Sequence, residues 1–295
     1  MNVVGHIDEL EPAARAVAIG TFDGVHLGHR AVIEQARVPG LRQTVVTFEP
    51  HPRITLGKRV QMLSTLGRRL ELLEELGVEE VLVLHFDDAL AALDAEAFAE
   101  SVFRKSGAQV VAAGADFVFG KGRRGNLDLL ERLGFEVHPV EIVEGVSSTR
   151  IRSLLADGEV VEAAALLGRP AEIEGTVELG DQRGGTLGFP TANLAVPDGL
   201  LVPKHGIYAG SALGHRAALS IGTNPHYGGS ERRIEAFLLD YEGNLYGQPL
   251  RIELWERLRD EAAFESEAAL VAAIASDVER TRAATRPGDQ APGVV

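Results

Sequence analysis

Short apolar runs alternate with helical segments through the first half of the chain, and this order constrains its fold more than any other feature. Each apolar run has the length of a strand and is followed by a segment whose apolar positions have helical spacing. Such alternation predicts a parallel sheet with helices on both faces. We expect strands near residues 16–19, 44–48, 80–84, 110–113 and 136–140, and helices near 29–37, 67–76, 94–106 and 125–133.

The second half of the chain has a different composition and a different pattern of apolar residues. After residues 168–170, Gly-Arg-Pro, glycine and β-branched residues become frequent and turn signals separate short runs. This predicts an antiparallel barrel or sandwich, followed by a helix from Glu261 to about Ala284. Two short helices are expected before the change, near 148–156 and 159–167. The expected organisation is an α/β domain over 1–168, a β domain over 169–287 and a flexible tail over 288–295.

Composition limits the chemistry that the chain can carry. It has no cysteine, which excludes disulfides, thiolate nucleophiles, iron–sulfur clusters and cysteine zinc sites. Its formal net charge of −14 disfavours a long nucleic-acid footprint, which needs clustered basic side chains. No apolar run approaches the roughly 18 residues that cross a bilayer, and residues 1–12 lack the pattern of a secretory signal. We expect a soluble cytoplasmic protein without nucleic-acid or membrane partners, and the sequence leaves its oligomeric state open.

The segment over residues 20–29, GTFDGVHLGH, lies between a predicted strand and a predicted helix. A strand that leads through glycines into a helix N-terminus leaves backbone N–H groups and a partial positive charge, which favour phosphate. His26 and His29 add two imidazoles that can stabilise charge developing on a phosphate. Taken alone, the same pattern also fits a turn with one capping histidine.

Two loops that follow predicted strands carry further candidate groups. The segment FEPHP at 48–52 contains His51, and it also fits a rigid loop with an exposed histidine. The segment GADFVFGKG at 114–122 does not have the spacing of a P-loop. Its Phe117 and Phe119 could instead flank a planar ring.

A third segment, SSTRIR at 147–152, opens a predicted helix. Serine and threonine are ordinary N-caps, so a purely structural role is open. Hydroxyl groups, helix-end N–H groups and Arg152 together would also suit a triphosphate.

The second half holds a glycine-dense loop that enters a strand at residues 180–193. Thr191 and Asn193 project from the same face of that strand, and their oxygens suit Mg²⁺. Glu235 is the one carboxylate in the apolar run 234–239. Because an isolated carboxylate is costly to bury, Glu235 either faces solvent at a barrel rim or acts as a general base.

Together these segments resemble the bifunctional prokaryotic riboflavin kinase/FAD synthetase family, from about Val17 to about Ala284. The segments GTFDGVHLGH, FEPHP, GADFVFGKG and SSTRIR are similar to its FMN adenylyltransferase module, a Rossmann-like α/β domain. The second half is similar to its riboflavin kinase module, a six-stranded antiparallel β-barrel with a C-terminal helix. That similarity rests on GGTLGFPTAN (184–193), GIYAG (206–210), IGTNPHYGG (221–229) and IEAFLLDYEGNLYG (234–247).

The resemblance implies two consecutive reactions, in which riboflavin and ATP give FMN, and FMN and a second ATP give FAD and pyrophosphate. It implies that His26 and His29 stabilise the ATP phosphates, that Glu235 is the kinase base, and that Thr191 and Asn193 hold Mg²⁺. The implied ATP-binding residues of the adenylyltransferase are Gly20, Phe22, Asp23, Gly24, His26, His29, Ser147, Ser148, Thr149 and Arg152. The implied FMN-binding residues there are His51, Asp116, Phe117 and Phe119, and the implied ATP-binding residues of the kinase are Gly180, Gly188, Pro190, Thr191 and Asn193.

Three positions depart from the family pattern. Asp116 stands where some relatives carry Asn, Gly185 where Arg is common, and Ala171 where an aromatic residue is common. Two alternative functions follow from the residues: transfer of a nucleotide to another phosphate, and flavin binding without turnover. The kinase-like half disfavours the first, and the retained polar side chains disfavour the second.

Overall fold

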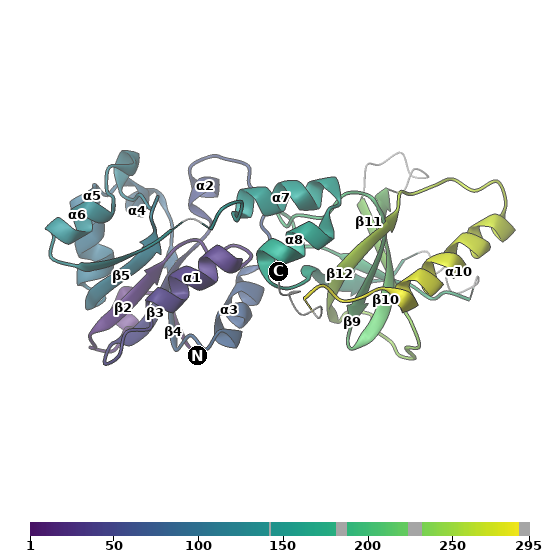
Figure 1. Cartoon of the computed structure of the whole chain (residues 1–295), viewed down its shortest axis with the longest axis horizontal. Helices are drawn as coiled ribbons and strands as arrows, with labels where there is room; N and C mark the ends of the chain where they lie inside the picture. The colour runs from purple at the N-terminus through teal and green to yellow at the C-terminus, as the bar shows by residue number, and fades with distance from the viewer. Residues whose placement is uncertain (142, 181–187, 224–231, 289–295) are drawn as a thin grey trace, which may run out of the picture. The chain divides into compact units, whose positions relative to one another are not determined.

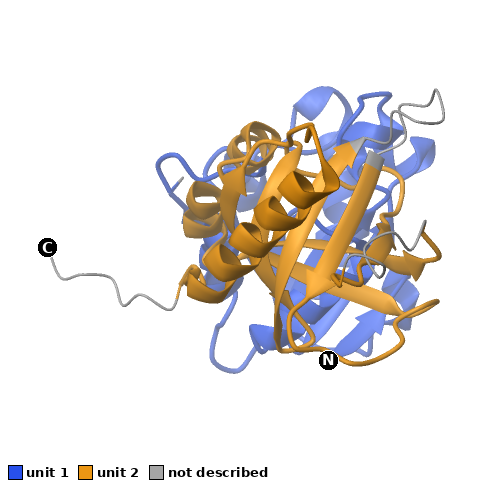
Figure 2. Cartoon of the chain, turned by 90° about the vertical axis from the view of Figure 1, so that its right-hand side faces the viewer, with its two compact units in different colours: residues 1–148 blue, residues 149–295 orange. Residues whose placement is uncertain are grey.

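The chain divides into two compact units, which Figure 2 shows in two colours. The computed structural model describes residues 1–141, 143–180, 188–223 and 232–288. Residues 1–148 form the sheet unit, and residues 149–295 form the barrel unit. A parallel sheet organises the first, and a closed barrel organises the second.

Six parallel strands form the sheet in the order β1-β4-β3-β2-β5-β6 (Figure 1). After β2 the chain builds one side of the sheet with β3 and β4, and then crosses to build the other with β5 and β6. Such a reversal opens a crevice at the carboxyl ends of β2 and β5, the usual ligand position in this architecture. The strands are β1 (Asn2–Val4), β2 (Arg15–Ile19), β3 (Arg42–Glu49), β4 (Glu80–His85), β5 (Ala108–Gly114) and β6 (Glu136–Val140).

Helices cover both faces of this sheet, as the alternating pattern predicts. One face packs against α1 (Leu27–Gln35) and α3 (Leu66–Glu75). The other packs against α5 (Ala95–Phe98), a following π-helical segment (Ala99–Arg104) and α6 (Leu127–Arg132). The unit also contains short turns of helix that are too brief for a periodic signal: α2 (Pro52–Thr55), α4 (Asp88–Ala92), η1 (Ile7–Glu9) and η3 (Lys121–Arg123).

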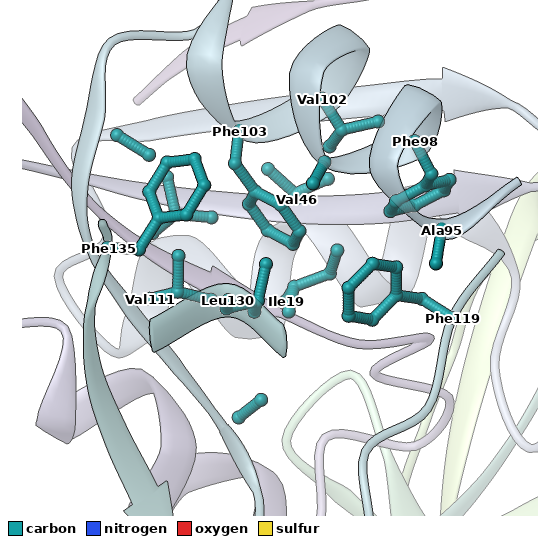
Figure 3. Packing of buried hydrophobic residues seen from close by; sticks show 14 of the residues in the cluster. Ile19, Val46, Ala95, Phe98, Val102, Phe103, Val111, Phe119, Leu130 and Phe135 are labelled. Carbon is teal, nitrogen blue, oxygen red and sulfur yellow. The ribbon is translucent and has the colours of Figure 1, made fainter. Parts of the chain in front are cut away.

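Phenylalanine rings fill the core on the second face of the sheet. Figure 3 shows Phe98, Phe103, Phe119 and Phe135 converging there. The ring centroids of Phe98 and Phe119 lie 5.4 Å apart, and those of Phe103 and Phe135 lie 5.9 Å apart in an edge-to-face arrangement. Large buried apolar side chains each contribute about 1.5–3 kcal/mol, so this cluster anchors the helices that follow β4 and β5.

The barrel closes in the order β10-β11-β8-β7-β12-β9, with antiparallel neighbours (Figure 1). Close approach of β9 to β12 requires glycine at Gly210, where a Cβ atom would lie 1.8 Å from the carbonyl oxygen of Glu253. The barrel strands are β7 (Ala171–Glu178), β8 (Ala192–Ala195), β9 (Gly206–Ala212), β10 (His215–Thr223), β11 (Arg232–Leu238) and β12 (Pro249–Arg259).

The described residues of the barrel unit include the helices α7 (Ser148–Asp157, whose first residue belongs to the sheet unit), α8 (Val160–Leu167) and α10 (Glu267–Ala283). Helix α8 packs against β7 and β12. Helix α10 begins later than the expected Glu261, because β12 continues to Arg259 and Ser266 then caps the helix. The α/β domain followed by a six-stranded barrel and a C-terminal helix is confirmed, whereas the expected boundary at residue 168 stays a prediction.

Candidate active sites

The loop between β2 and α1 is held in a strained backbone form. The angle φ is 48° at Phe22, 78° at Gly24 and 39° at Val25. Positive φ is unfavourable for residues with a Cβ atom, above all for β-branched valine. The side chains of Phe22 and Val25 are buried in the core below the loop, and Gly20 packs against the Phe22 ring. Packing therefore fixes the loop at the carboxyl end of β2.

His26 and His29 lie together at the start of α1. The Nδ1 atom of His26 accepts a hydrogen bond from the backbone N–H of His29 at 3.2 Å and caps the helix. The two rings stack with centroids 3.5 Å apart and planes 14° apart. Gly28 leaves space for this stack, since a Cβ atom there would lie 3.3 Å from the His26 ring. Because Nδ1 accepts, Nε2 carries the proton of the neutral His26 ring and remains a donor.

The carboxylate of Asp23 ties this loop to the segment before α3. It is fully buried and accepts hydrogen bonds from the backbone N–H groups of Leu63, at 2.9 Å, and Ser64, at 3.2 Å. The hydroxyl of Ser64 in turn accepts from the backbone N–H of Gly24 at 3.2 Å. The expected contact between Asp23 and ATP stays a prediction, and the structure shows that this side chain positions the loop.

The start of α7 reaches the same loop from far along the sequence. The hydroxyl of Ser148 donates a hydrogen bond to the carbonyl oxygen of Asp23 at 3.2 Å. The structure thus brings Ser148 of the predicted SSTRIR segment to the predicted GTFDGVHLGH segment. Ser147 and Thr149 are exposed, and Arg152 is half-buried on α7.

Sequence reasoning missed Arg69, a buried cation below the loop. Its guanidinium donates hydrogen bonds to the carbonyl oxygen of Phe48, at 3.1 Å, and to the carboxylate of Glu49, at 3.3 Å. Burial lowers the pKa of Arg69, against the opposite effects of Asp23 and Glu49. A signal did exist, because Arg69 precedes the apolar pair Leu72 and Leu73 by three and four residues and so shares their helix face.

The predicted FMN-binding residues lie in loops after β3 and β5. His51 is buried and caps α2, where its Nδ1 atom accepts from the backbone N–H of Arg53 at 3.0 Å. Asp116 is exposed and Phe117 is half-buried. Phe119 is buried in the aromatic core, and Phe117 stacks on it with centroids 5.5 Å apart. Of the two rings, Phe117 therefore has the accessible surface.

The barrel carries a second cluster on neighbouring strands. Asn193 on β8 lies directly opposite Glu235 on β11. The Nε atom of Arg233 donates to Asn193 Oδ1 at 3.1 Å and forms an ion pair with Glu235 Oε1 at 2.9 Å. The side chains of Arg233 and Glu235 are 29% and 30% exposed, so Glu235 is neither fully solvated nor unpaired. Sequence reasoning missed Arg233, although its spacing of two residues from Glu235 places both on one strand face.

Of the other predicted kinase residues, Gly180 lies directly beside this cluster. Gly180 packs so closely on Asn193 that a Cβ atom there would lie 2.0 Å from Asn193 Nδ2. Pro190 and Thr191 line a cavity of about 130 Å³ in the barrel unit. Gly188 is exposed and has a φ of 86°. Residues 184–187 and 224–229 of the predicted motifs lie outside the described residues.

Hydroxyl and amide oxygens such as those of Thr191 and Asn193 are hard donors, which suit a cation that is bound chiefly through a nucleotide. Among the residues that the structure describes, no group of three or more His, Asp or Glu side chains is placed to hold a metal. Asn193 Oδ1 already accepts from a guanidinium, so this oxygen faces a position that suits positive charge. Two neutral protein oxygens would leave most of the coordination to phosphates and water, as Mg²⁺ commonly requires.

Two family models match the chain, FAD synthetase over residues 8–154 and riboflavin kinase over residues 167–285. The bifunctional riboflavin kinase/FMN adenylyltransferase of Listeria monocytogenes is 36% identical, with 94% of each chain covered. The protein of that description from Escherichia coli K12 is also 36% identical, over 94% of this chain and 96% of its own. The chain belongs to the bifunctional riboflavin kinase/FMN adenylyltransferase family. The resemblance seen in the sequence is thereby confirmed, and enzymes of this kind generally use a divalent metal.

A solved structure supports the same fold. A crystal structure from Streptococcus pneumoniae, described as a macrolide-efflux protein, matches with a TM-score of 0.86 and 32% identity. The match covers 95% of this chain and 98% of the other. In the part of this family member that the structure describes, no helix has the length and apolar character to cross a membrane.

Proposed function

We propose that this chain makes FAD from riboflavin in two ATP-dependent steps, with riboflavin kinase activity in the barrel unit and FMN adenylyltransferase activity in the sheet unit. One observation carries the proposal. The stacked His26–His29 pair lies within the region that matches FAD synthetase, and the Asn193–Glu235 pair lies within the region that matches riboflavin kinase. Each half of the chain therefore pairs a family match with side chains suited to its reaction.

In the kinase step Glu235 is the general base. Its carboxylate takes the proton of the ribityl 5′-hydroxyl of riboflavin, whose oxygen attacks the γ-phosphorus of ATP. The bond from that phosphorus to the bridging oxygen breaks, and FMN and ADP leave. Thr191 and Asn193 would hold Mg²⁺, which when bound offsets the negative charge of the phosphates. Gly180, Gly188 and Pro190 form the loop that borders ATP.

In the adenylyltransferase step a phosphate oxygen of FMN attacks the α-phosphorus of a second ATP, and pyrophosphate leaves. No side chain forms a covalent intermediate. The His26 Nε2–H group, the His29 ring and the N–H groups at the start of α1 stabilise the charge that develops on the phosphates. The strained loop adds to the rate because these donors are positioned before ATP arrives.

Further assignments extend this proposal. ATP is contacted by the loop residues Gly20, Phe22, Asp23 and Gly24 and by the α7 segment residues Ser147, Ser148, Thr149 and Arg152. FMN is bound by His51, Asp116 and Phe117, with Phe119 supporting Phe117 from the core. We retain an adenylyltransferase domain over 1–168, a kinase domain over 169–287 and a tail over 288–295. Both steps consume ATP, which favours a cytoplasmic enzyme, and its strongly negative net charge of −14 favours small ligands over nucleic acid.

The test is direct. The purified chain is incubated with riboflavin, ATP and Mg²⁺, and the flavins are resolved by chromatography over time. We expect FMN to form first and FAD to follow, with one ATP used in each step. Formation of FMN without FAD, or of neither, would contradict the two-step function.

A further inference from the structure

Arg233 bonds to both side chains that the proposed kinase mechanism uses. A single atom, Nε, reaches Asn193 Oδ1 at 3.1 Å and Glu235 Oε1 at 2.9 Å. The guanidinium also carries two terminal amino groups, whose planar fork matches the geometry of phosphate oxygens. The side chain is 29% exposed, so a nucleotide can reach it.

The position of these contacts matters for phosphoryl transfer. The transferred phosphorus lies between the attacking hydroxyl and the leaving oxygen. Glu235 has to lie within hydrogen-bond reach of the hydroxyl, whereas Asn193 faces the phosphates of ATP. A group that bonds to Glu235 and Asn193 together therefore lies beside the path of the phosphoryl group.

Charge supports the same conclusion. A carboxylate base close to a triphosphate repels it, and the repulsion is strong in a partly desolvated site. Among the described side chains assigned to this reaction, Thr191 and Asn193 are neutral and Glu235 is negative. Arg233 adds a positive charge directly beside Glu235 and Asn193.

We propose that Arg233 is a further catalytic residue of the kinase step and contacts the γ-phosphate of ATP during its transfer, an inference that rests on the function proposed above. The guanidinium stays paired with Glu235 and exchanges Asn193 for the phosphate oxygens. It then offsets the charge on those oxygens while the new bond to the ribityl oxygen forms and the bond to ADP breaks. The proton of the hydroxyl still passes to Glu235.

A purely structural role, in which Arg233 only ties β8 to β11, predicts different results. In that structural role, loss of Arg233 would weaken the binding of all nucleotides equally and would lower the stability of the barrel unit. Loss of a γ-phosphate contact would weaken the binding of ATP but not the binding of ADP. It would also lower kcat while leaving the KM for riboflavin nearly unchanged. The two roles can therefore be separated by comparing nucleotides that differ only in the γ-phosphate.

The experiment compares Arg233→Ala and Arg233→Lys with the matched control Arg282→Ala. Arg282 lies in the same unit, in an exposed ion pair with Asp240 at 2.7 Å. We expect Arg233→Ala to lower kcat for FMN formation about 100- to 1,000-fold, the usual effect of losing one preorganised donor. Arg233→Lys keeps the charge but lacks the planar fork, so its kcat should be at least about tenfold higher than that of Arg233→Ala. Arg282→Ala should change kcat less than about threefold.

Binding supplies a readout that does not depend on turnover. Isothermal titration with Mg²⁺ present compares ADP with the β,γ-imido analogue of ATP on Arg233→Ala and on the unchanged chain, so that binding at the other nucleotide site is common to both. Arg233→Ala should weaken the binding of the analogue about 10- to 100-fold, as expected for the loss of a hydrogen bond to a charged group. The same substitution should weaken the binding of ADP less than about threefold.

The outcomes are decisive. If Arg233→Ala weakens the binding of ADP and of the analogue equally, or leaves kcat unchanged, the proposed γ-phosphate contact of Arg233 is overturned. Asn193→Ala and Glu235→Gln are measured alongside, and normal FMN formation by both would mean that the proposed kinase site itself is wrong. Normal Trp255 fluorescence and circular dichroism of each variant verify that the barrel is folded.

Discussion

The two candidate sites are held in place by opposite means. In the sheet unit, the loop before α1 is strained, and its Phe22, Asp23 and Val25 side chains are buried. Hydrogen bonds from Ser64 and Ser148 reach the same loop from separate elements. In the barrel unit, regular strands carry Asn193, Arg233 and Glu235, which are half-exposed and contact one another.

This difference follows the chemistry proposed for each site. Stabilising charge on a phosphate requires donors that are fixed in advance, and a buried network provides them. Removing a proton from a bound hydroxyl requires a carboxylate that the substrate can reach. Substitutions in the sheet site should therefore reduce both stability and rate, whereas those in the barrel site should reduce rate alone.

Glu235→Gln tests the barrel half of this contrast and should have the largest effect. Glutamine keeps the size of the side chain but cannot accept the proton, so riboflavin phosphorylation should fall about 100- to 10,000-fold. The thermal midpoint should barely change, because the side chain is half-exposed. Both quantities are measured on one preparation. Near-normal FMN production at an unchanged midpoint would remove Glu235 from the mechanism.

Glu80→Gln tests the dependence of the sheet unit on buried charge. Glu80 and Arg15 form an ion pair at 2.7 Å with side chains 1% and 2% exposed. Removing one partner of such a pair typically costs about 3–5 kcal/mol of the free energy of unfolding. The control is Asp240→Asn in the barrel, whose ion pair with Arg282 at 2.7 Å is exposed, so the free energy of unfolding should barely change. Circular dichroism follows both units, while fluorescence of Trp255, the single tryptophan, follows the barrel.

The same pair predicts a pH dependence. Burial acts to raise the pKa of Glu80, but hydrogen bonds from Arg15 and Thr44 lower it below its ordinary 4.5. A carboxylate with a lowered pKa in the folded state stabilises the fold above its unfolded pKa, and this stability is lost as the pH falls through the folded pKa. Acid titration of the intact chain should therefore destabilise the sheet unit below about pH 4.5. Glu80→Gln should flatten that part of the curve, and an unchanged acid slope would exclude Glu80 as its source.

His29→Ala tests the sheet site without removing buried charge. We expect FAD synthesis to slow about 100- to 1,000-fold, equivalent to about 2.7–4 kcal/mol of transition-state stabilisation. FMN formation should stay near normal, since Glu235 and Asn193 lie in the other unit. The two rates are measured with supplied FMN and supplied riboflavin. An equal loss of both would contradict two separate sites.

Moving the N-terminal boundary of a barrel fragment should have the smallest effect, a change in the stability of that fragment. The family model for riboflavin kinase begins at residue 167, but α8 before it packs on β7 and β12, with Val160 and Leu167 buried. A fragment over 149–295 should therefore be more stable than one over 169–295 by about 3 kcal/mol, from two buried side chains. Urea unfolding followed by Trp255 fluorescence measures the difference. Equal stabilities would favour a boundary at residue 168.

The sequence predicts the architecture well because periodic burial of apolar residues is a local signal. The strands and main helices of the sheet unit follow from it, as do the barrel and its C-terminal helix. The three-residue strand β1 and the π-helical segment after α5 give no such signal. The late start of α10 was missed because residues 260–263, Asp-Glu-Ala-Ala, between β12 and Ser266 have the composition of a helix start.

The candidate sites are less predictable than the fold. His26 and His29 stand out because they share one short motif. Arg69 and Arg233 do not, because their partners Glu49 and Asn193 become neighbours only through strand order, helix packing and register. The positioning role of Asp23 was hidden for the same reason, since its partners lie 40 and 41 residues away.

One mixing experiment tests the central claim that two separate sites catalyse consecutive reactions. Glu235→Gln protein should fail to use riboflavin but convert supplied FMN to FAD, whereas His29→Ala protein should stop at FMN. An equimolar mixture of the two, given riboflavin, ATP and Mg²⁺, should produce FAD after a lag in which FMN accumulates. No FAD from the mixture, although each protein retains its own partial reaction, would contradict the account.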